Sequence, residues 1–215
     1  MIKQFTFNHF EVNTYVVVDE QTKQCAIVDP ACEASFEDSQ LFVFVETFHE
    51  TSLQVTHILL THAHVDHIAG LRQVCEHYKL PVTMHAEGRH LLRQAEAYGS
   101  VMGFAVDNMG DLEVAEIADG EIIHVGSIDI ECRYVPGHCP GSMCYVVPTD
   151  KAVITGDALF HFSIGRTDLP GGDYPTLIEK LKSRVLTLPD DYRVLPGHGI
   201  ASQIGKEKKY NSFLV

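Results

Sequence analysis

The sequence lacks any long apolar run: no stretch approaches the ~20 residues that a membrane-spanning helix requires. The first five residues begin neither an apolar core region nor a small-residue cleavage site, so we expect no secretory signal. The six cysteines include no Cys-x-x-Cys pair, which disfavours a disulfide framework or a structural zinc knot. We therefore expect reduced thiols, a cytoplasmic location and no membrane partner.

Basic residues are also scarce. The chain has 16 Lys and Arg against 29 Asp and Glu, which gives a formal net charge of −13. Such a balance disfavours a general nucleic-acid or anionic-membrane surface. The 215 residues contain no repeat, low-complexity segment or linker, and 45% of them are hydrophobic. We therefore expect a single domain over residues 1–215, with a sizeable core.

Histidine is abundant, with 13 residues, and we interpret eight of these as ordinary surface or half-buried side chains. The other five, together with two aspartates, form four short clusters. Each cluster directly follows a strand-like apolar run. These candidate ligands are His62, His64, Asp66, His67, His138, Asp157 and His198.

Imidazole and carboxylate groups suit zinc, iron or manganese, and seven ligands are too many for one tetrahedral ion. The set therefore favours two ions about 3.5–4 Å apart that share a bridging group, with hydrolysis by a metal-activated water. His62 and His64 are two residues apart, so an extended segment would direct both side chains to one ion. Asp66 and His67 follow at an expected change of direction and would reach the second.

Periodicity predicts an α/β protein. The expected helices are 36–50, 66–79, 87–98 and one that opens at Asp173–Pro175, and the weakly periodic residues 99–118 are expected to connect elements. The expected strands are 3–7, 13–19, 24–29, 55–60, 82–85, 121–125, 127–135, 143–147, 152–155 and 193–195. Four of these strands run directly into the ligand clusters. If their carboxyl ends meet, all seven ligands converge on one sheet edge.

The ligand set His62-x-His64-x-Asp66-His67, His138, Asp157 and His198 resembles that of the metallo-β-lactamase superfamily, over nearly the whole chain. The resemblance implies an αββα sandwich with two divalent metal ions. We expect these ions to be zinc, although iron and manganese are also compatible with the ligands. It assigns the first ion to His62, His64 and His138. It assigns the second to Asp66, His67 and His198, with Asp157 bridging the two.

Within that superfamily, the segment from Ser163 to Asp173, with Gly-Arg-Thr-Asp at 165–168, is similar to the glyoxalase II branch, as is Pro196-Gly197-His198-Gly199. That similarity implies a hydroxyacylglutathione hydrolase-like thioesterase, which cleaves S-D-lactoylglutathione or a related small-molecule thiol ester with a metal-bridged hydroxide. Asp66 would steer the proton of the attacking water. Arg166 would bind a carboxylate of the thiol carrier.

The chain departs from the longer glyoxalase II proteins in three places. Only 17 residues follow His198 (215 minus 198), so the helical domain that helps to bind glutathione in those proteins is not expected here. Their lysine and tyrosine after the bridging aspartate correspond to Arg166 and Asp168. Cys139 stands where the family often has threonine.

Other functions remain open on the same fold. A persulfide dioxygenase with a single iron shares the Gly-Arg-Thr-Asp segment and the ligand motifs. A non-catalytic metal-binding protein is a second alternative, which the full ligand set disfavours. A β-lactamase is disfavoured by the expected cytoplasmic location and by the glyoxalase-like loop.

Overall fold

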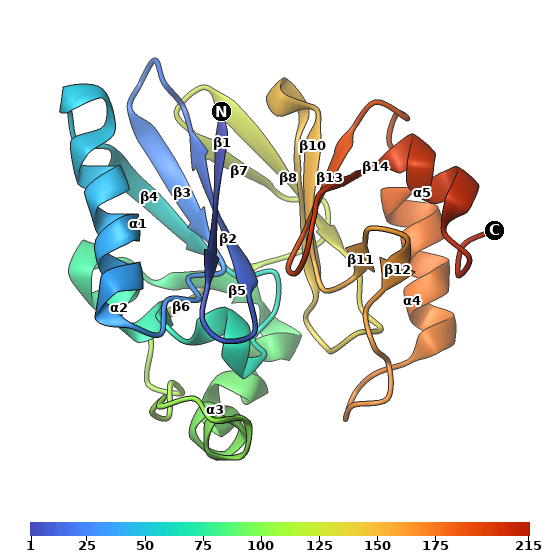
Figure 1. The fold of residues 1–215 in the computed structure, drawn as a ribbon, viewed down its shortest axis with the longest axis horizontal. Coiled ribbons are helices and arrows are strands. Elements are labelled where there is room, and N and C mark those ends of the chain that lie inside the picture. Colours follow the sequence, from blue (N-terminus) through green and yellow to red (C-terminus); the bar gives the residue numbers. More distant parts are fainter.

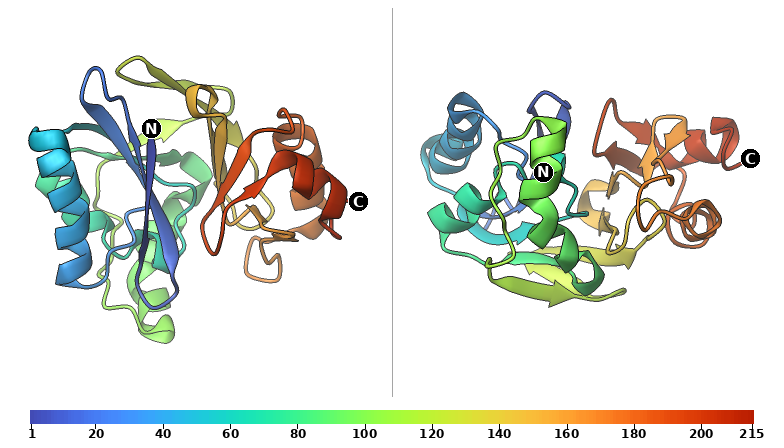
Figure 2. Two further views of the ribbon diagram at one scale, coloured as in Figure 1. Left: turned by 45° about the horizontal axis from the view of Figure 1, so that its top comes forward. Right: turned by 90° about the horizontal axis from the view of Figure 1, so that it is seen from below.

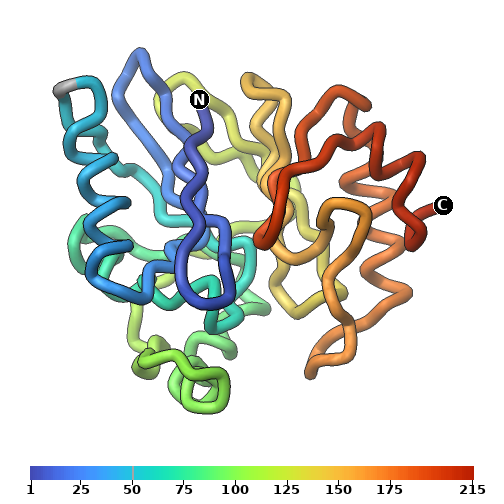
Figure 3. Tube along the Cα trace, viewed as in Figure 1, coloured from blue at the N-terminus to red at the C-terminus, as the bar shows by residue number. Residues whose placement is uncertain are grey.

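Two six-stranded β-sheets face one another, and helices cover the outer face of each sheet (Figure 1). The computed structural model describes residues 1–49 and 51–215. The arrangement is the αββα sandwich that the family resemblance implies. The first half of the chain builds one sheet with its helices, and the second half builds the other (Figure 3). Among the described residues, no helix combines the length and the apolar character needed to cross a bilayer.

The first sheet has the order β1-β2-β3-β4-β5-β6, and its strands from β3 onward pair in parallel. These strands are β1 (Ile2–Phe7), β2 (Val12–Val18), β3 (Gln24–Val28), β4 (Gln54–Leu59), β5 (Val82–His85) and β6 (Val114–Ile117). Parallel pairing requires crossover connections, which here contain helices. The covering helices are α1 (Ser35–Thr47), α2 (Leu71–Tyr78) and α3 (Arg89–Met102).

The second sheet has the order β14-β13-β10-β9-β8-β7, and only β10 and β13 pair in parallel. Its strands are β7 (Ile122–Val125), β8 (Ile128–Tyr134), β9 (Met143–Val147), β10 (Ala152–Gly156), β13 (Arg193–Pro196) and β14 (Ser202–Gln203). A small hairpin joins β11 (Leu159–Phe160) to β12 (Ser163–Ile164). The outer face is covered by α4 (Tyr174–Lys180), which continues as a π-helical turn over Leu181–Val185, and by α5 (Ile204–Tyr210) (Figure 2).

Alternating side chains distribute the apolar residues between three cores. On β2, Tyr15 and Val17 point between the sheets, whereas Val16 and Val18 point toward the helices of the first half. The layer between the sheets also contains Tyr145 of β9, which is fully buried. Both sheets therefore bury both faces, which accounts for the near-continuous apolar runs of their central strands.

Two predicted elements were wrong in extent. The helix expected over residues 66–79 is divided into a 3-10 turn, η2 (Val65–Ile68), and α2, which begins at Leu71. The division falls at Gly70, where an added Cβ would lie 2.9 Å from the Cys32 carbonyl oxygen. This close approach to a neighbouring loop cannot be recognised from helical periodicity.

The segment 99–118 was expected to connect elements, but it contains the end of α3 and all of β6. Strand β6 lies at the edge of the sheet and pairs in parallel with β5, and its mostly half-buried residues lack the continuous apolar run that identifies a central strand. The first helix was expected to reach Glu50, which lies outside the described residues, and α1 ends at Thr47. Strands β11, β12 and β14 and helix α5 were not predicted.

Candidate metal centre

The seven candidate ligands converge at one edge of the sandwich. Strands β4, β8, β10 and β13 end there, and each continues into one ligand cluster (Figure 1). Close approach of the turns requires glycine at Gly197, where an added Cβ would lie 2.6 Å from Cε1 of His67. The predicted convergence of the strand ends is therefore present.

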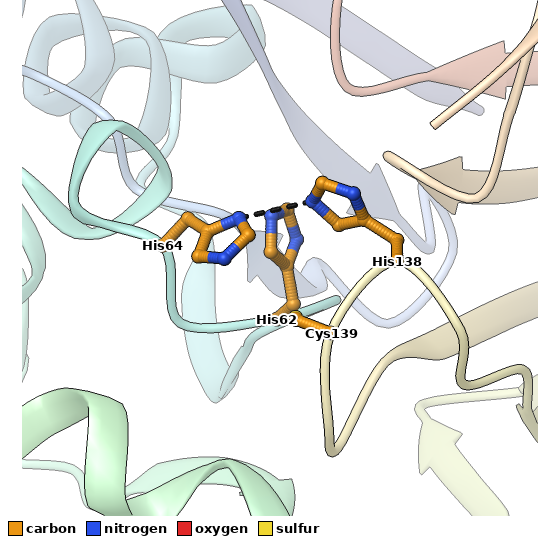
Figure 4. Close-up of side chains that lie close together, drawn as sticks. All are labelled: His62, His64, His138 and Cys139. Carbon is orange, nitrogen blue, oxygen red and sulfur yellow. Dashed lines mark hydrogen bonds between the residues drawn. The ribbon is translucent and has the colours of Figure 1, made fainter. Parts of the chain in front are cut away.

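His62, His64 and His138 form a first group, in which one side-chain donor atom from each lies within 4.8 Å of the others. Their rings face a common space (Figure 4). Nε2 of His138 lies 2.9 Å from Nδ1 of His64. Cys139 has its Sγ within the same limit, but this thiol is buried and lies 3.3 Å from Oγ of Ser142. Burial raises the pKa of the Cys139 thiol to about 12.

Asp66, His67 and His198 form a second group with donor atoms equally close. Asp157 lies between the two groups. Its Oδ1 is 3.3 Å from Nε2 of His67, and its Oδ2 is 3.5 Å from Nε2 of His198 and 3.8 Å from Nε2 of His138. Asp157 therefore contacts the second group through both carboxylate oxygens and the first group through Oδ2.

Three buried polar atoms at this edge indicate that the cluster suits a cation. Within the described residues, Nε2 of His62, Nε2 of His67 and Oδ1 of Asp157 have no hydrogen-bond partner. Buried polar atoms without partners are costly and uncommon. Metal ions would satisfy all three, since each atom can present a lone pair to the centre. The donor set therefore fits divalent metal ions.

The imidazole rings are held by hydrogen bonds on their other nitrogen. Nδ1 of His67 donates to Oδ2 of Asp29 at 2.9 Å, and Nδ1 of His138 donates to the carbonyl of Arg166 at 2.8 Å. Nδ1 of His198 donates to the carbonyl of Phe10 at 2.9 Å. In each of these rings Nδ1 is fixed as the donor and Nε2 is directed toward the cluster, which is the orientation of histidine ligands of metals.

Asp29 was not predicted as part of the site. It follows β3 directly and has a positive φ of 51°. Its Oδ1 accepts from the amide of Thr61 at 2.7 Å, and its Oδ2 accepts from Oγ1 of Thr61 at 2.6 Å as well as from His67. The Thr61 hydroxyl in turn accepts from Nδ1 of His62 at 3.1 Å. An aspartate directly after a buried strand, as at Asp157, was the signal available in the sequence.

Asn8 was also not predicted, although it supports the second group. Its Nδ2 donates to the carbonyl of Asp66 at 2.9 Å, and its Oδ1 accepts from the amide of Phe10 at 2.9 Å. Because Phe10 in turn accepts from His198, the turn between β1 and β2 positions two residues of the group. No local sequence pattern distinguishes Asn8 from an ordinary turn asparagine.

The two groups differ in their electrostatics. Burial, with neighbouring imidazoles, lowers the pKa of His62 well below its usual range and that of His64 to about 4. Burial also disfavours a charged His67, but the carboxylates of Asp157 and Asp66 outweigh it and raise its pKa. Burial opposes ionisation of Asp66, yet His67 and His198 lower its pKa. The first group thus presents neutral imidazoles, and the second pairs imidazole with carboxylate.

A cavity of about 220 Å³ opens beside the cluster, and Asp66, His138, Asp157 and His198 line it. Arg166 also lines it, which brings this residue to the site as expected. Nε and Nη2 of Arg166 donate to Asp168 at 2.7 and 2.9 Å. Asp173 caps α4 by accepting a hydrogen bond from the amide of Thr176.

The sequence profile of the metallo-beta-lactamase superfamily matches residues 8–198. A relative from Haemophilus influenzae, named hydroxyacylglutathione hydrolase GloC, is 33% identical over 95% of this chain and 93% of its own length. A relative from Bacillus subtilis, the probable metallo-hydrolase YqgX, is 37% identical over 95% of this chain and 92% of its own.

Several solved structures are also similar to this chain. The structure described as BLEG-1 B3 metallo-beta-lactamase has a TM-score of 0.87 at 30% identity and full coverage of both chains. TTHA1623, described in a di-iron-bound form, has a TM-score of 0.85 at 33% identity over 99% of this chain and all of its own. ETHE1 from Myxococcus xanthus has a TM-score of 0.78 at 27% identity, over this whole chain and 84% of its own.

Proposed function

The chain belongs to the metallo-β-lactamase superfamily, and on that basis we propose that it is a two-metal thioester hydrolase of the glyoxalase II type. Its substrate would be S-D-lactoylglutathione or a related small-molecule thiol ester. The observation that carries the two-metal proposal is the position of Asp157, which contacts both ligand groups. A single domain over residues 1–215 and a cytoplasmic location belong to the same proposal.

The first ion would be held by His62, His64 and His138, and the second by Asp66, His67 and His198, with Asp157 shared. Zinc is the expected metal, and iron or manganese would suit the same ligands. When bound, such ions activate a water for attack and polarise the carbonyl under attack.

The protein groups have separate roles in this proposal. Asp66 remains ionised, because neighbouring imidazoles lower its pKa, and its Oδ2 lies 3.2 Å from Nε2 of His198. An ionised carboxylate at the cavity wall can accept a hydrogen bond from the attacking water and orient it. Arg166, on the same cavity, would bind a carboxylate of the thiol carrier. Phe10 and Leu91 contribute apolar surface to the cavity wall.

One finding supports a thioesterase in particular. The relative named hydroxyacylglutathione hydrolase is 33% identical over nearly the whole chain. The arginine of the segment Gly165–Asp168 lies on the cavity beside the candidate ligands, where it can bind an anionic thiol carrier. That segment is shared with persulfide dioxygenases, so it supports the binding of a carrier rather than the reaction type.

The test combines elemental analysis with a substrate panel on protein loaded with zinc, iron or manganese in turn. We expect about two metal equivalents per chain in the active form. We also expect hydrolysis of S-D-lactoylglutathione, which is monitored through the thiol that the reaction releases. Absence of thioester cleavage with all three metals would refute the proposal. If the panel were inactive throughout, the non-catalytic alternative would be supported.

A persulfide dioxygenase is the second candidate, because such enzymes share the Gly-Arg-Thr-Asp segment found here at residues 165–168. Oxygen uptake with glutathione persulfide by a one-iron form would support it. The likeness to BLEG-1 makes β-lactam hydrolysis a further arm of the panel. Activity confined to a β-lactam would replace the thioesterase proposal.

A further inference from the structure

Helix α3 presents an apolar stripe to the cavity beside the candidate metal centre. Leu91, Ala95, Tyr98 and Met102 line the cavity, and their spacing of four, three and four residues places them on one face of the helix. Leu91 and Ala95 are buried, whereas Tyr98 is 37% and Met102 39% exposed. The stripe therefore extends from the floor of the cavity to its mouth.

Phe10, from the turn between β1 and β2, extends this apolar surface. Its ring stacks on that of Phe104 with centroids 5.3 Å apart and is 41% exposed. The surface is concave and includes Asp66 and His198 in its lining. A group bound against it would therefore lie beside the reacting centre, which distinguishes it from an exposed patch elsewhere on the molecule.

Positive charge reaches the cavity from the second half of the chain. Among the described lining residues, Arg166 is the only arginine or lysine, and it lies in the segment between β12 and α4. The guanidinium group of Arg166 is paired with Asp168, which reduces its attraction for a further anion. The lining is thus apolar along α3, whereas the segment between β12 and α4 contributes one partly neutralised cation together with Leu169 and Pro170.

We propose that the acyl group of the substrate is apolar, with the size of an aromatic ring or a straight chain of four to six carbons, and binds against the α3 stripe. The thiol carrier would extend past Arg166. This inference rests on the proposed thioester hydrolysis and selects, among its substrates, a related thiol ester over S-D-lactoylglutathione as the preferred one. A cavity of about 150 Å³ is known to hold benzene, so the 220 Å³ available here suits such a group.

The alternative is a small hydroxyacyl group such as lactoyl. Within the stripe its hydroxyl would find only the hydroxyl of Tyr98 as a strong hydrogen-bonding group, and most of the stripe would stay uncovered. Each methylene removed from water favours binding by about fourfold. An apolar acyl chain should therefore raise kcat/KM progressively until the stripe is covered.

The first experiment uses one carrier and varies the acyl group. Acetyl, lactoyl, butanoyl, hexanoyl and benzoyl thioesters of glutathione are hydrolysed by the metal-loaded protein. We expect kcat/KM for hexanoyl or benzoyl to exceed that for acetyl at least about tenfold. Equal values across the series, or a maximum at lactoyl, would overturn the inference.

Variants test whether the stripe is responsible. Tyr98→Gln and Met102→Gln replace apolar surface with polar groups at partly exposed positions. Each should reduce the hexanoyl-to-acetyl ratio of kcat/KM by about threefold or more. Val101→Gln is the matched control, because Val101 lies on the same helix, is 84% exposed and does not line the cavity. An unchanged ratio in both stripe variants would place the preference elsewhere and overturn the inference.

Two further experiments distinguish a wrong orientation of the substrate from the absence of an apolar site or of thioesterase activity. If acetyl thioesters of benzyl thiol are preferred while acyl length has no effect, the apolar group belongs to the thiol and the proposed orientation is wrong. Thermal stabilisation of the metal-loaded protein by hexanoate, compared with acetate, measures apolar binding without turnover. Stronger stabilisation by hexanoate without any thioester cleavage would support the apolar site while refuting the proposed function. Equal stabilisation would count against the site itself.

Discussion

Asp29 and His67 form a buried hydrogen bond of 2.9 Å that joins the end of β3 to the ligand loop after β4. Both side chains are almost fully inaccessible to solvent. The same carboxylate also accepts from the amide and the hydroxyl of Thr61. One residue outside the ligand set therefore fixes the orientation of His67 directly and of His62 through Thr61.

Asp29→Asn should weaken metal binding although Asn has nearly the same shape. The amide removes a negative charge and offers only one oxygen acceptor in place of two. Supporting residues of this kind commonly change metal affinity by about 10–100-fold. Metal titration with a competing chelator measures the change. Asp38→Asn is the control, since Asp38 is buried but contacts no candidate ligand. Equal affinities in the wild type and in Asp29→Asn would contradict the role assigned to Asp29.

Asp157→Asn should reduce the metal content from about two equivalents to about one, with loss of activity. The substitution removes the carboxylate charge that faces both groups. Elemental analysis of samples dialysed in parallel gives the stoichiometry. If wild-type protein is active with one equivalent, the two-metal proposal is wrong whatever the variant shows.

Arg166→Ala should mainly raise KM for a glutathione thioester, by about tenfold, with little change in kcat. The guanidinium lies away from the reacting carbonyl in this proposal, and the Arg166 carbonyl that accepts from His138 is retained. The effect should shrink with a thioester whose carrier has no carboxylate. A similar fall in kcat for both substrates, with loss of metal, would instead indicate that the Arg166–Asp168 pair holds the loop.

Asp19 should make stability depend on pH through a contact between the two halves of the chain. Its carboxylate accepts from the amide and the hydroxyl of Ser127, chiefly through the backbone bond, and these bonds lower its pKa. Because the pKa is lower in the folded state, the stabilisation is present above the usual value of 3.8 and is lost as the pH falls toward the folded value.

Asp19→Asn should therefore be less stable than the wild type at pH 7, and the difference should diminish below about pH 4. Urea unfolding of both proteins at a series of pH values measures it. A constant difference at all pH values would mean that the hydrogen-bond geometry, rather than the charge, is responsible. Asp129→Asn serves as a control, because Asp129 is exposed in the adjacent hairpin.

All six cysteines should react with a thiol reagent after unfolding without reductant. Each is a free thiol in the structure, and all six are buried. Burial raises the pKa of Cys25, Cys75 and Cys132 to about 12, so the folded protein should react slowly. Recovery of fewer than six thiols from freshly prepared protein would count against the proposed cytoplasmic location.

The sequence by itself identified the candidate ligand set and most of the strands. Strand-like runs such as 143–147 are recognisable because both faces of these strands are buried, which requires continuous apolar residues. The residues after β4, β8, β10 and β13 could be identified because their chemistry is concentrated in short segments. Convergence of the strand ends then followed from general sheet topology.

Only the tertiary structure revealed which other side chains support the ligands. Asp29 and Asn8 act on residues 38 and 58 positions away in the chain, and no local pattern encodes such contacts. The position of β6 likewise depends on its neighbour β5 rather than on its own four residues. The apolar wall of α3 was also hidden, because helical periodicity shows that a face is apolar without showing whether it packs against the core or lines a cavity. That distinction depends on where the helix lies relative to the two sheets.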